Sequence, residues 1–92
     1  MTFQEDKVGD FLEIFEATKS KIRGFQGCLH LELLKDINQS NIFFTYSHWQ
    51  DESCLDDYRN SDTFRNVWSQ TKALFSDKPL AFSLKKFIEV NK

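Results

Sequence analysis

Residues 41–64 read NIFFTYSHWQDESCLDDYRNSDTF, and the interpretation of the whole chain starts from this stretch. The run from Ile42 to Trp49 is rich in aromatic and β-branched residues, which favour a strand. After residues 50–52 the apolar positions change to helical spacing, and Asn60-Ser61-Asp62 divides the helix in two. The stretch therefore predicts a strand that ends at Trp49 and leads into a split helix. Ligand sites are common at such junctions in domains that combine strands and helices.

The sequence before this stretch predicts a helix and another strand. The helix spans about Lys7 to Arg23, with Glu5 or Asp6 as its N-cap and Gly24 as a left-handed stop. Its apolar stripe is formed by residues at helical spacing. These residues are Val8, Phe11, Leu12, Phe15 and Ile22.

The segment 28–34 alternates as a strand, with Leu29, Leu31 and Leu33 on one face and Cys28, His30, Glu32 and Leu34 on the other. A polar turn over 36–41 comes next, which predicts an antiparallel hairpin with 42–49. In the second strand of that hairpin, His48 points away from Trp49.

The sequence after Trp49 predicts two short helical segments and a last strand. Asp51 or Ser53 caps the first segment, and Ser61 caps the second. The stripe of the second segment consists of Phe64, Val67, Trp68, Thr71 and Phe75. The helix ends at 77–79, and residues 81–90 alternate as a strand.

This order, with a strand at the start of the chain, predicts an α+β fold of the ferredoxin-like β-α-β-β-α-β type. Met1 to Gln4 would be the first strand, which is central in such a sheet, between the third and fourth strands. It is unusually short. Two explanations are open: these residues form a shortened central strand, or the natural chain begins upstream of Met1.

Composition limits the class of protein. The chain has 92 residues, enough for a single domain spanning 1–92, and 15% of them are aromatic, including ten Phe. The net charge of −2 gives no reason to expect nucleic-acid or membrane binding. No run is long enough to span a bilayer, and the start of the chain lacks a signal sequence, which favours the cytoplasm. Cys28 and Cys54 lack CxxC spacing and are expected as free thiols, with a disulfide or metal site as the alternative.

The ordered set of Trp49, Tyr58 and Ser61-Asp62-Thr63-Phe64, with Gly24-Phe25-Gln26-Gly27-Cys28 upstream, resembles the antibiotic biosynthesis monooxygenase family. The likeness covers about Val8 to Lys86. It implies a homodimeric α+β barrel, closed through the open sheet face, that oxidises electron-rich aromatics such as quinols and anthrones with molecular oxygen. No flavin or nicotinamide fingerprint appears in the sequence, so an enzyme of this kind is expected to work without a bound redox cofactor. The acidic residue often found two before the tryptophan is Ser47 here, and a frequent helix histidine is Tyr58.

Face geometry and the resemblance together give the candidate site. Trp49 and Tyr58 are the catalytic candidates, as pocket wall and hydrogen-bond donor. Small polar side chains beside Trp49 would leave room for a flat ligand, with two further rings as wall. The substrate-binding candidates are Thr45, Ser47, Phe64 and Trp68.

Other functions stay open. Either His30 or His48 could act as a base, although a surface or interface histidine is the simpler interpretation of each. No clustered metal ligands or phosphate loop are present. The haem-degrading branch of the family aligns without a gap, but its iron-binding histidine falls on Trp68, whose indole cannot ligate iron through its N–H. A non-catalytic dimeric module that binds a small ligand is the alternative of another class.

Overall fold

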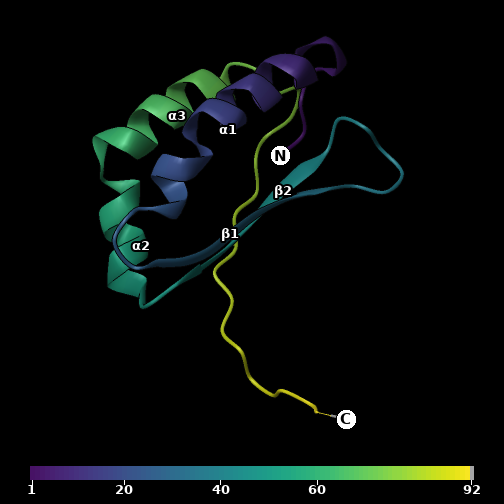
Figure 1. Ribbon diagram of the computed structural model, residues 1–92. Coiled ribbons are helices and arrows are strands. Elements are labelled where there is room, and N and C mark those ends of the chain that lie inside the picture. Colours follow the sequence, from purple (N-terminus) through teal and green to yellow (C-terminus); the bar gives the residue numbers. More distant parts are fainter. Residues whose placement is uncertain (92) are drawn as a thin grey trace.

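The computed structural model describes residues 1–91 and places the helices on one side of a β-hairpin (Figure 1). A 3-10 turn, Glu5–Lys7, leads into helix α1, Val8–Arg23. The hairpin strands are β1, Cys28–Lys35, and β2, Phe43–Trp49. After them come helices α2, Glu52–Arg59, and α3, Asp62–Lys72. Figure 1 shows α1 and α3 side by side, with α2 at the end of α3 where the hairpin strands start and finish.

The antiparallel hairpin is confirmed, with a register that separates two faces. His30 is opposite His48, Glu32 is opposite Tyr46, and these four side chains share the outer face, away from the helices. The register shifts between Cys28 and His30, so that Cys28 is opposite Trp49.

The predicted faces of Cys28 and Leu29 are therefore wrong. Cys28 is buried, and Leu29 is exposed. The physical reason is this irregularity, a bulge-like step, since one extra residue in a strand reverses the side-chain alternation before it.

The shortened first strand is confirmed, between the hairpin and the segment after α3. Thr2 bridges Ile42 on one side, and Phe3 bridges Phe75 on the other, both antiparallel. The Phe3 amide donates to the Asn41 carbonyl at 2.9 Å, and the Ser76 amide donates to the Thr2 carbonyl at 3.0 Å. The α+β, ferredoxin-like class is thus confirmed, with only a short central element.

The predicted last strand, residues 81–90, is wrong in this structure. Residues 78–91 carry no helix or strand. The start of this segment lies near β2, since Leu80 and Phe82 line a small pocket with Phe44, and Figure 1 shows the segment crossing the hairpin in this view and ending beyond it. A strand needs an edge of unpaired backbone groups on which to form. On this side of the first strand the backbone bonds join Gln4 to Leu74 and Thr2 to Ser76, and the pairing stops there.

The core is aromatic and centred on Phe3, whose side chain has no exposed surface. Its ring stacks on Phe11 of α1 with centroids 4.2 Å apart, and it also contacts the rings of Phe43 and Phe75. Phe3, Phe11 and Phe43 form the buried cluster that joins the first strand, α1 and β2.

The helix caps are confirmed in part. The Asp51 carboxylate accepts a hydrogen bond from the Cys54 amide, and the Ser61 hydroxyl accepts one from the Phe64 amide. The expected cap at Glu5 or Asp6 is wrong, because α1 has no side-chain cap. Gly24 is also not left-handed. The positive φ falls on Gly27, at +87°, within the turn that leads into β1.

Within the described part of the chain, no helix combines the length and apolar character that crossing a membrane requires.

Replacing Phe3 tests how far the fold depends on this packing. Phe3→Ala should lower the free energy of unfolding by about 3–5 kcal/mol, since it removes a large buried ring from the centre of the core. Urea unfolding monitored by circular dichroism measures the change. Ile37→Ala is the matched control, because Ile37 is 97% exposed, and it should change the free energy by less than about 0.5 kcal/mol. A Phe3→Ala loss as small as that of the control would contradict the central role of Phe3.

Candidate functional site

The four predicted site aromatics and Phe25 contact one another in an unbroken series, here called the Trp49 cluster: Phe25, Trp49, Tyr58, Phe64 and Trp68. Trp49 stacks on Tyr58 with centroids 5.2 Å apart and an interplanar angle of 26°. Tyr58 contacts the Phe64 ring edge to face, and Phe64 stacks on Trp68 at 5.9 Å. The end of β2, α2 and α3 each contribute rings, so the split helix brings the cluster together.

Phe25 is a member that the sequence reasoning missed. Its ring lies edge to face against both Trp49, at 6.3 Å, and Tyr58, at 5.3 Å. The signal that could have found it is its place between Gly24 and Gly27, in the segment 24–28 on which the resemblance partly rests.

Gly27 explains why this turn packs so tightly on α2. A Cβ at this position would collide with the Sγ of Cys54, and the positive φ disfavours other residues as well. The Gln50 amide also donates to the Gly27 carbonyl at 2.7 Å, which ties the turn to the end of β2. Gly27 therefore lets α2 approach the turn, and this holds Phe25 against Trp49 and Tyr58.

The polar groups in and beside the Trp49 cluster are uncharged hydrogen-bonding groups. The Trp49 Nε1–H donates to the Ser47 hydroxyl at 3.0 Å, on the same face of β2. Burial raises the pKa of Tyr58 to about 12, with a smaller contribution from Cys28. Tyr58 is thus a neutral phenol at physiological pH, able to donate a hydrogen bond but not to act as a base.

The Cys54 thiol is held in its neutral form. The hydrogen bond with Asp51 raises the pKa of Cys54 above its ordinary value, and desolvation adds to the shift. Bonds from Ser53 and from the Cys54 amide lower the pKa of Asp51. Because the thiolate is the nucleophilic form of cysteine, this environment argues against a nucleophilic role for Cys54. Cys28 and Cys54 are both free thiols, as expected.

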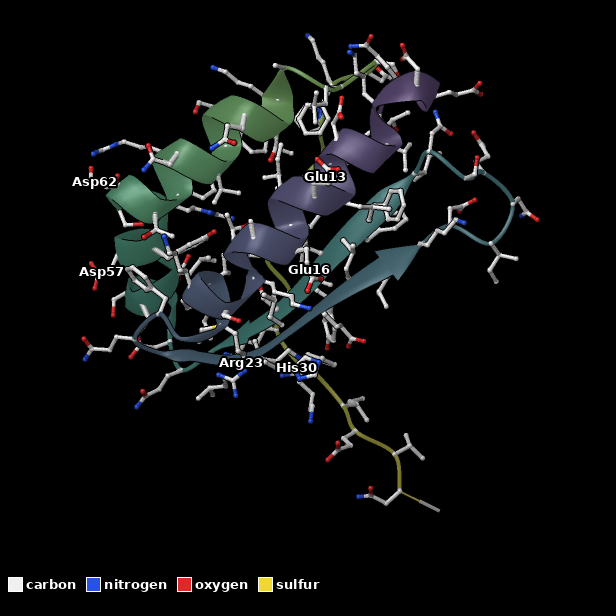
Figure 2. The ribbon with its side chains drawn as sticks, turned by 45° about the horizontal axis from the view of Figure 1, so that its top comes forward. Glu13, Glu16, Arg23, His30, Asp57 and Asp62 are labelled. Atoms are coloured by element: carbon white, nitrogen blue, oxygen red, sulfur yellow. The ribbon has the colours of Figure 1, made fainter. Side chains whose placement is uncertain are left out.

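An open groove of about 740 Å³ lies between α1 and β1, a volume within the range of small-molecule sites. Its apolar floor consists of Leu12, Phe15, Leu31 and Leu33. Charged side chains line its rim, and Figure 2 shows two of them, Glu16 and Arg23, on α1. The Arg23 guanidinium donates to the Cys28 carbonyl at 2.7 Å, which fixes that end of the groove.

The groove and the Trp49 cluster lie on the same face of the hairpin. Leu31 is directly opposite Ser47, and Leu33 is directly opposite Thr45. Side chains of directly opposed residues lie about 4.5–5.5 Å apart at their Cβ atoms. The polar pair predicted to leave room for a ligand thus borders the groove floor, although Thr45 is exposed and lies outside the Trp49 cluster.

The two histidines lie on the opposite, outer face of the hairpin, and both are exposed. The placement of the two histidines therefore does not support a role as a base beside the Trp49 cluster.

Comparison with solved structures gives many similar folds. Rv0793 from Mycobacterium tuberculosis superposes with a TM-score of 0.83 and 19% identity, over 98% of this chain and 91% of that one. A candidate antibiotic biosynthesis monooxygenase from Deinococcus radiodurans gives a TM-score of 0.81 and 16% identity, over 99% and 92%. Another from Caulobacter crescentus gives 0.81 and 16%, over 87% and 76%. At sequence identities of 16–19%, these structural similarities establish the fold and nothing further.

Comparison with curated proteins gave no match. The family model described as antibiotic biosynthesis monooxygenase matches residues 1–68, which include β1, β2, α2 and the whole Trp49 cluster. This match covers well over half of the chain, and the chain therefore belongs to the antibiotic biosynthesis monooxygenase family.

Proposed function

We propose that this protein is a cofactor-independent monooxygenase that acts on small electron-rich aromatics of the quinol or anthrone type. The observation that carries the proposal is the family match over residues 1–68. The family and its structural neighbours support a monooxygenase-type role. The choice of quinols or anthrones as the substrate class goes beyond them and is part of the proposal. The groove between α1 and β1 supports it further, because its volume and apolar floor suit a molecule of two or three fused rings.

The proposed reaction draws its electrons from the substrate. Ionisation of a phenol or an activated ring carbon gives an anion that passes one electron to oxygen. The resulting radical pair recombines to a hydroperoxide, which loses water. In the net reaction, a ring CH₂ or its enol form becomes a carbonyl, one oxygen atom enters the product and the other leaves as water.

The protein would supply orientation and a dry surface for this chemistry. In the proposed complex the substrate lies over Leu31 and Leu33, with its edge toward Ser47 and Trp49. The Ser47 hydroxyl, beside the groove floor, can stabilise a developing oxyanion by donating a hydrogen bond. The neutral Tyr58 phenol does not line the groove, so it would donate only to a substrate that reaches past Trp49. Phe64 and Trp68 form the wall behind Tyr58.

A non-catalytic ligand-binding module is the second candidate, and one observation favours it. The rings of the Trp49 cluster contact one another, and the Trp49 indole N–H is already bonded to Ser47. A substrate that uses Trp49 as a donor must therefore compete with Ser47. A protein of this kind would bind aromatic ligands in the groove without consuming oxygen.

We also propose a homodimer closed through the outer sheet face, in the reducing cytoplasm that the two free thiols suit. Leu34 and Phe44 are opposed on that face and partly exposed, and Phe44 is 53% exposed. The C-terminal segment adds large apolar side chains that are 72–94% exposed. These are Leu80, Phe82, Leu84, Phe87, Ile88 and Val90. So much exposed apolar surface on a small protein is typical of an interaction site.

Oxygen uptake with a panel of quinols and anthrones tests the activity. The wild-type protein should consume oxygen and release no hydrogen peroxide, because the second oxygen atom leaves as water. Trp49→Phe should lower kcat/KM at least about tenfold, since it alters the wall that orients the ring. Tyr58→Phe should lower it about five- to tenfold by removing one hydrogen-bond donor.

Tyr46→Phe is the matched control for this experiment. It makes the same chemical change on the outer face, so kcat/KM should stay within about twofold of the wild-type value. Binding of the aromatic compounds without oxygen uptake would contradict the monooxygenase and leave the ligand-binding module.

The ionisation of Tyr58 should appear in the stability of the protein above pH 10. The folded pKa of about 12 lies above the ordinary value of 10, so the unfolded chain loses this proton first as the pH rises. Below pH 10 the neutral phenol makes its full contribution to the free energy of unfolding. Between pH 10 and 12 that contribution is lost, which lowers the free energy of unfolding by about 1–3 kcal/mol. Urea unfolding at about pH 8, 10 and 11.5 measures it, and Tyr58→Phe should remove this part of the loss while Tyr46→Phe retains it. An equal pH dependence in wild type and Tyr58→Phe would contradict the assignment.

Sedimentation of two matched variants tests the homodimer. Phe44→Glu places a charge on the outer face and should weaken the dimer at least about tenfold, because the charge would lose water in the interface. Ile37→Glu makes the same change in the exposed loop between the strands and should leave the dimer intact. A wild-type protein that is monomeric at micromolar concentration would contradict the proposal.

A further inference from the structure

The outer face of the hairpin carries a cluster that neither the family match nor the proposed activity explains. The chain has two histidines, and the fold places them directly opposite each other, His30 on β1 and His48 on β2. Their ring centroids are 5.6 Å apart. Local sequence patterns do not reveal this pairing, because the two residues are far apart along the chain and meet only through the hairpin register.

The imidazole nitrogens of both histidines point toward the same neighbouring row of the sheet. His30 Nε2 lies 3.0 Å from the Glu32 carboxylate, and His48 Nε2 is hydrogen-bonded to the Tyr46 hydroxyl. Glu32 and Tyr46 are themselves opposite each other. Two imidazole nitrogens, one carboxylate and one phenol therefore approach a common patch of the surface.

We propose that this cluster is a binding site for a divalent transition-metal ion, Zn²⁺ or Cu²⁺, held by the Nε2 atoms of His30 and His48. Imidazole nitrogen with oxygen donors is the ligand set that these ions prefer. Two imidazoles on one tetrahedral Zn²⁺ have centroids about 5 Å apart, given Zn–N distances of about 2.0–2.1 Å. The 5.6 Å separation of these rings needs only a small adjustment to reach that geometry.

Glu32 would supply the third ligand. Among residues 1–91 no three His, Cys, Asp or Glu side chains already surround a common point, so Glu32 must turn from its bond with His30 to reach the ion. Its side chain is 43% exposed and has the freedom to do so. The remaining positions of the ion would be filled by water or by Tyr46.

The two histidines lie outside the candidate active site, although Glu32 also lines the groove between α1 and β1. His30 and His48 lie on the face of the hairpin opposite the Trp49 cluster, two pairs along that face from the Leu34–Phe44 pair of the proposed dimer. Figure 2 shows His30 at the end of β1 that is nearest Arg23. The inference does not depend on the oxygenase activity. Because the proposed dimer would cover this same outer face, the Zn²⁺ titration is also made with Phe44→Glu, the variant expected to leave that face open.

Calorimetric titration of the full chain with Zn²⁺ alone at neutral pH tests the site. We expect one ion per chain in the micromolar range and no binding of Mg²⁺, which prefers oxygen ligands. His30→Gln and His48→Gln should each lower the affinity at least about tenfold. Glu32→Gln should lower it about two- to fivefold, and Glu13→Gln, an exposed glutamate on α1, should leave it unchanged.

A measurement on the wild-type protein avoids dependence on the folding of the variants. Zn²⁺ should shift the NMR signals of both imidazole rings at the same concentration. With Cu²⁺, the electron paramagnetic resonance spectrum should show coupling to two nitrogens. Unchanged histidine signals, or equal Zn²⁺ affinity in His30→Gln, His48→Gln and the wild-type protein, would overturn the proposal.

Discussion

The fold depends on the insertion of Phe3 between the hairpin and the chain beyond α3. Thr2 and Phe3 are the central element of the sheet, yet they are only two residues, which lie opposite Ile42 and Phe75 and whose backbone groups bond to Asn41 and Ser76. So few bonds cannot hold a strand by themselves. The stacking of the Phe3 ring on Phe11 and its contacts with Phe43 and Phe75 supply the rest, because a buried aromatic ring contributes several kcal/mol.

This short central element also limits the structure of the C-terminal part of the chain. Because the backbone bonds on this side of the first strand reach only Leu74 and Ser76, the segment from Lys78 onward has no edge on which to continue as a strand. Its alternating apolar side chains stay exposed, as do those at the partly exposed outer face of the hairpin. The same shortage of backbone partners therefore explains both the missing last strand and much of the apolar surface that the proposed dimer would cover.

Local patterns predicted most of the fold, and the exceptions share a cause. The hairpin, the α3 stripe as far as Thr71 and the caps at Asp51 and Ser61 arise from spacing and from side chains that bond their own helix ends. The predicted helix end at 77–79 is wrong, because α3 ends at Lys72 and Phe75 instead lies opposite Phe3. The last strand was overpredicted because residues 81–90 have a strand pattern, while pairing depends on the length of a distant edge. The face of Cys28 was mispredicted because alternation assumes an unbroken register, and the register shifts before His30.

The residues of the candidate site also differ in whether local sequence patterns could predict them. Trp49, Tyr58, Phe64 and Trp68 were identifiable because one continuous stretch places them around the split helix. Phe25 joins them only through the approach of the Gly27 turn to α2, and the α1–β1 groove requires two segments that no local pattern relates. The register shift has a further consequence, since it sets Cys28 beside Trp49 while leaving His30 opposite His48. The irregular step in β1 changes only the placement of Cys28 and Leu29, and the regular alternation of the two strands keeps Trp49 under the helices and both imidazoles on the outer face.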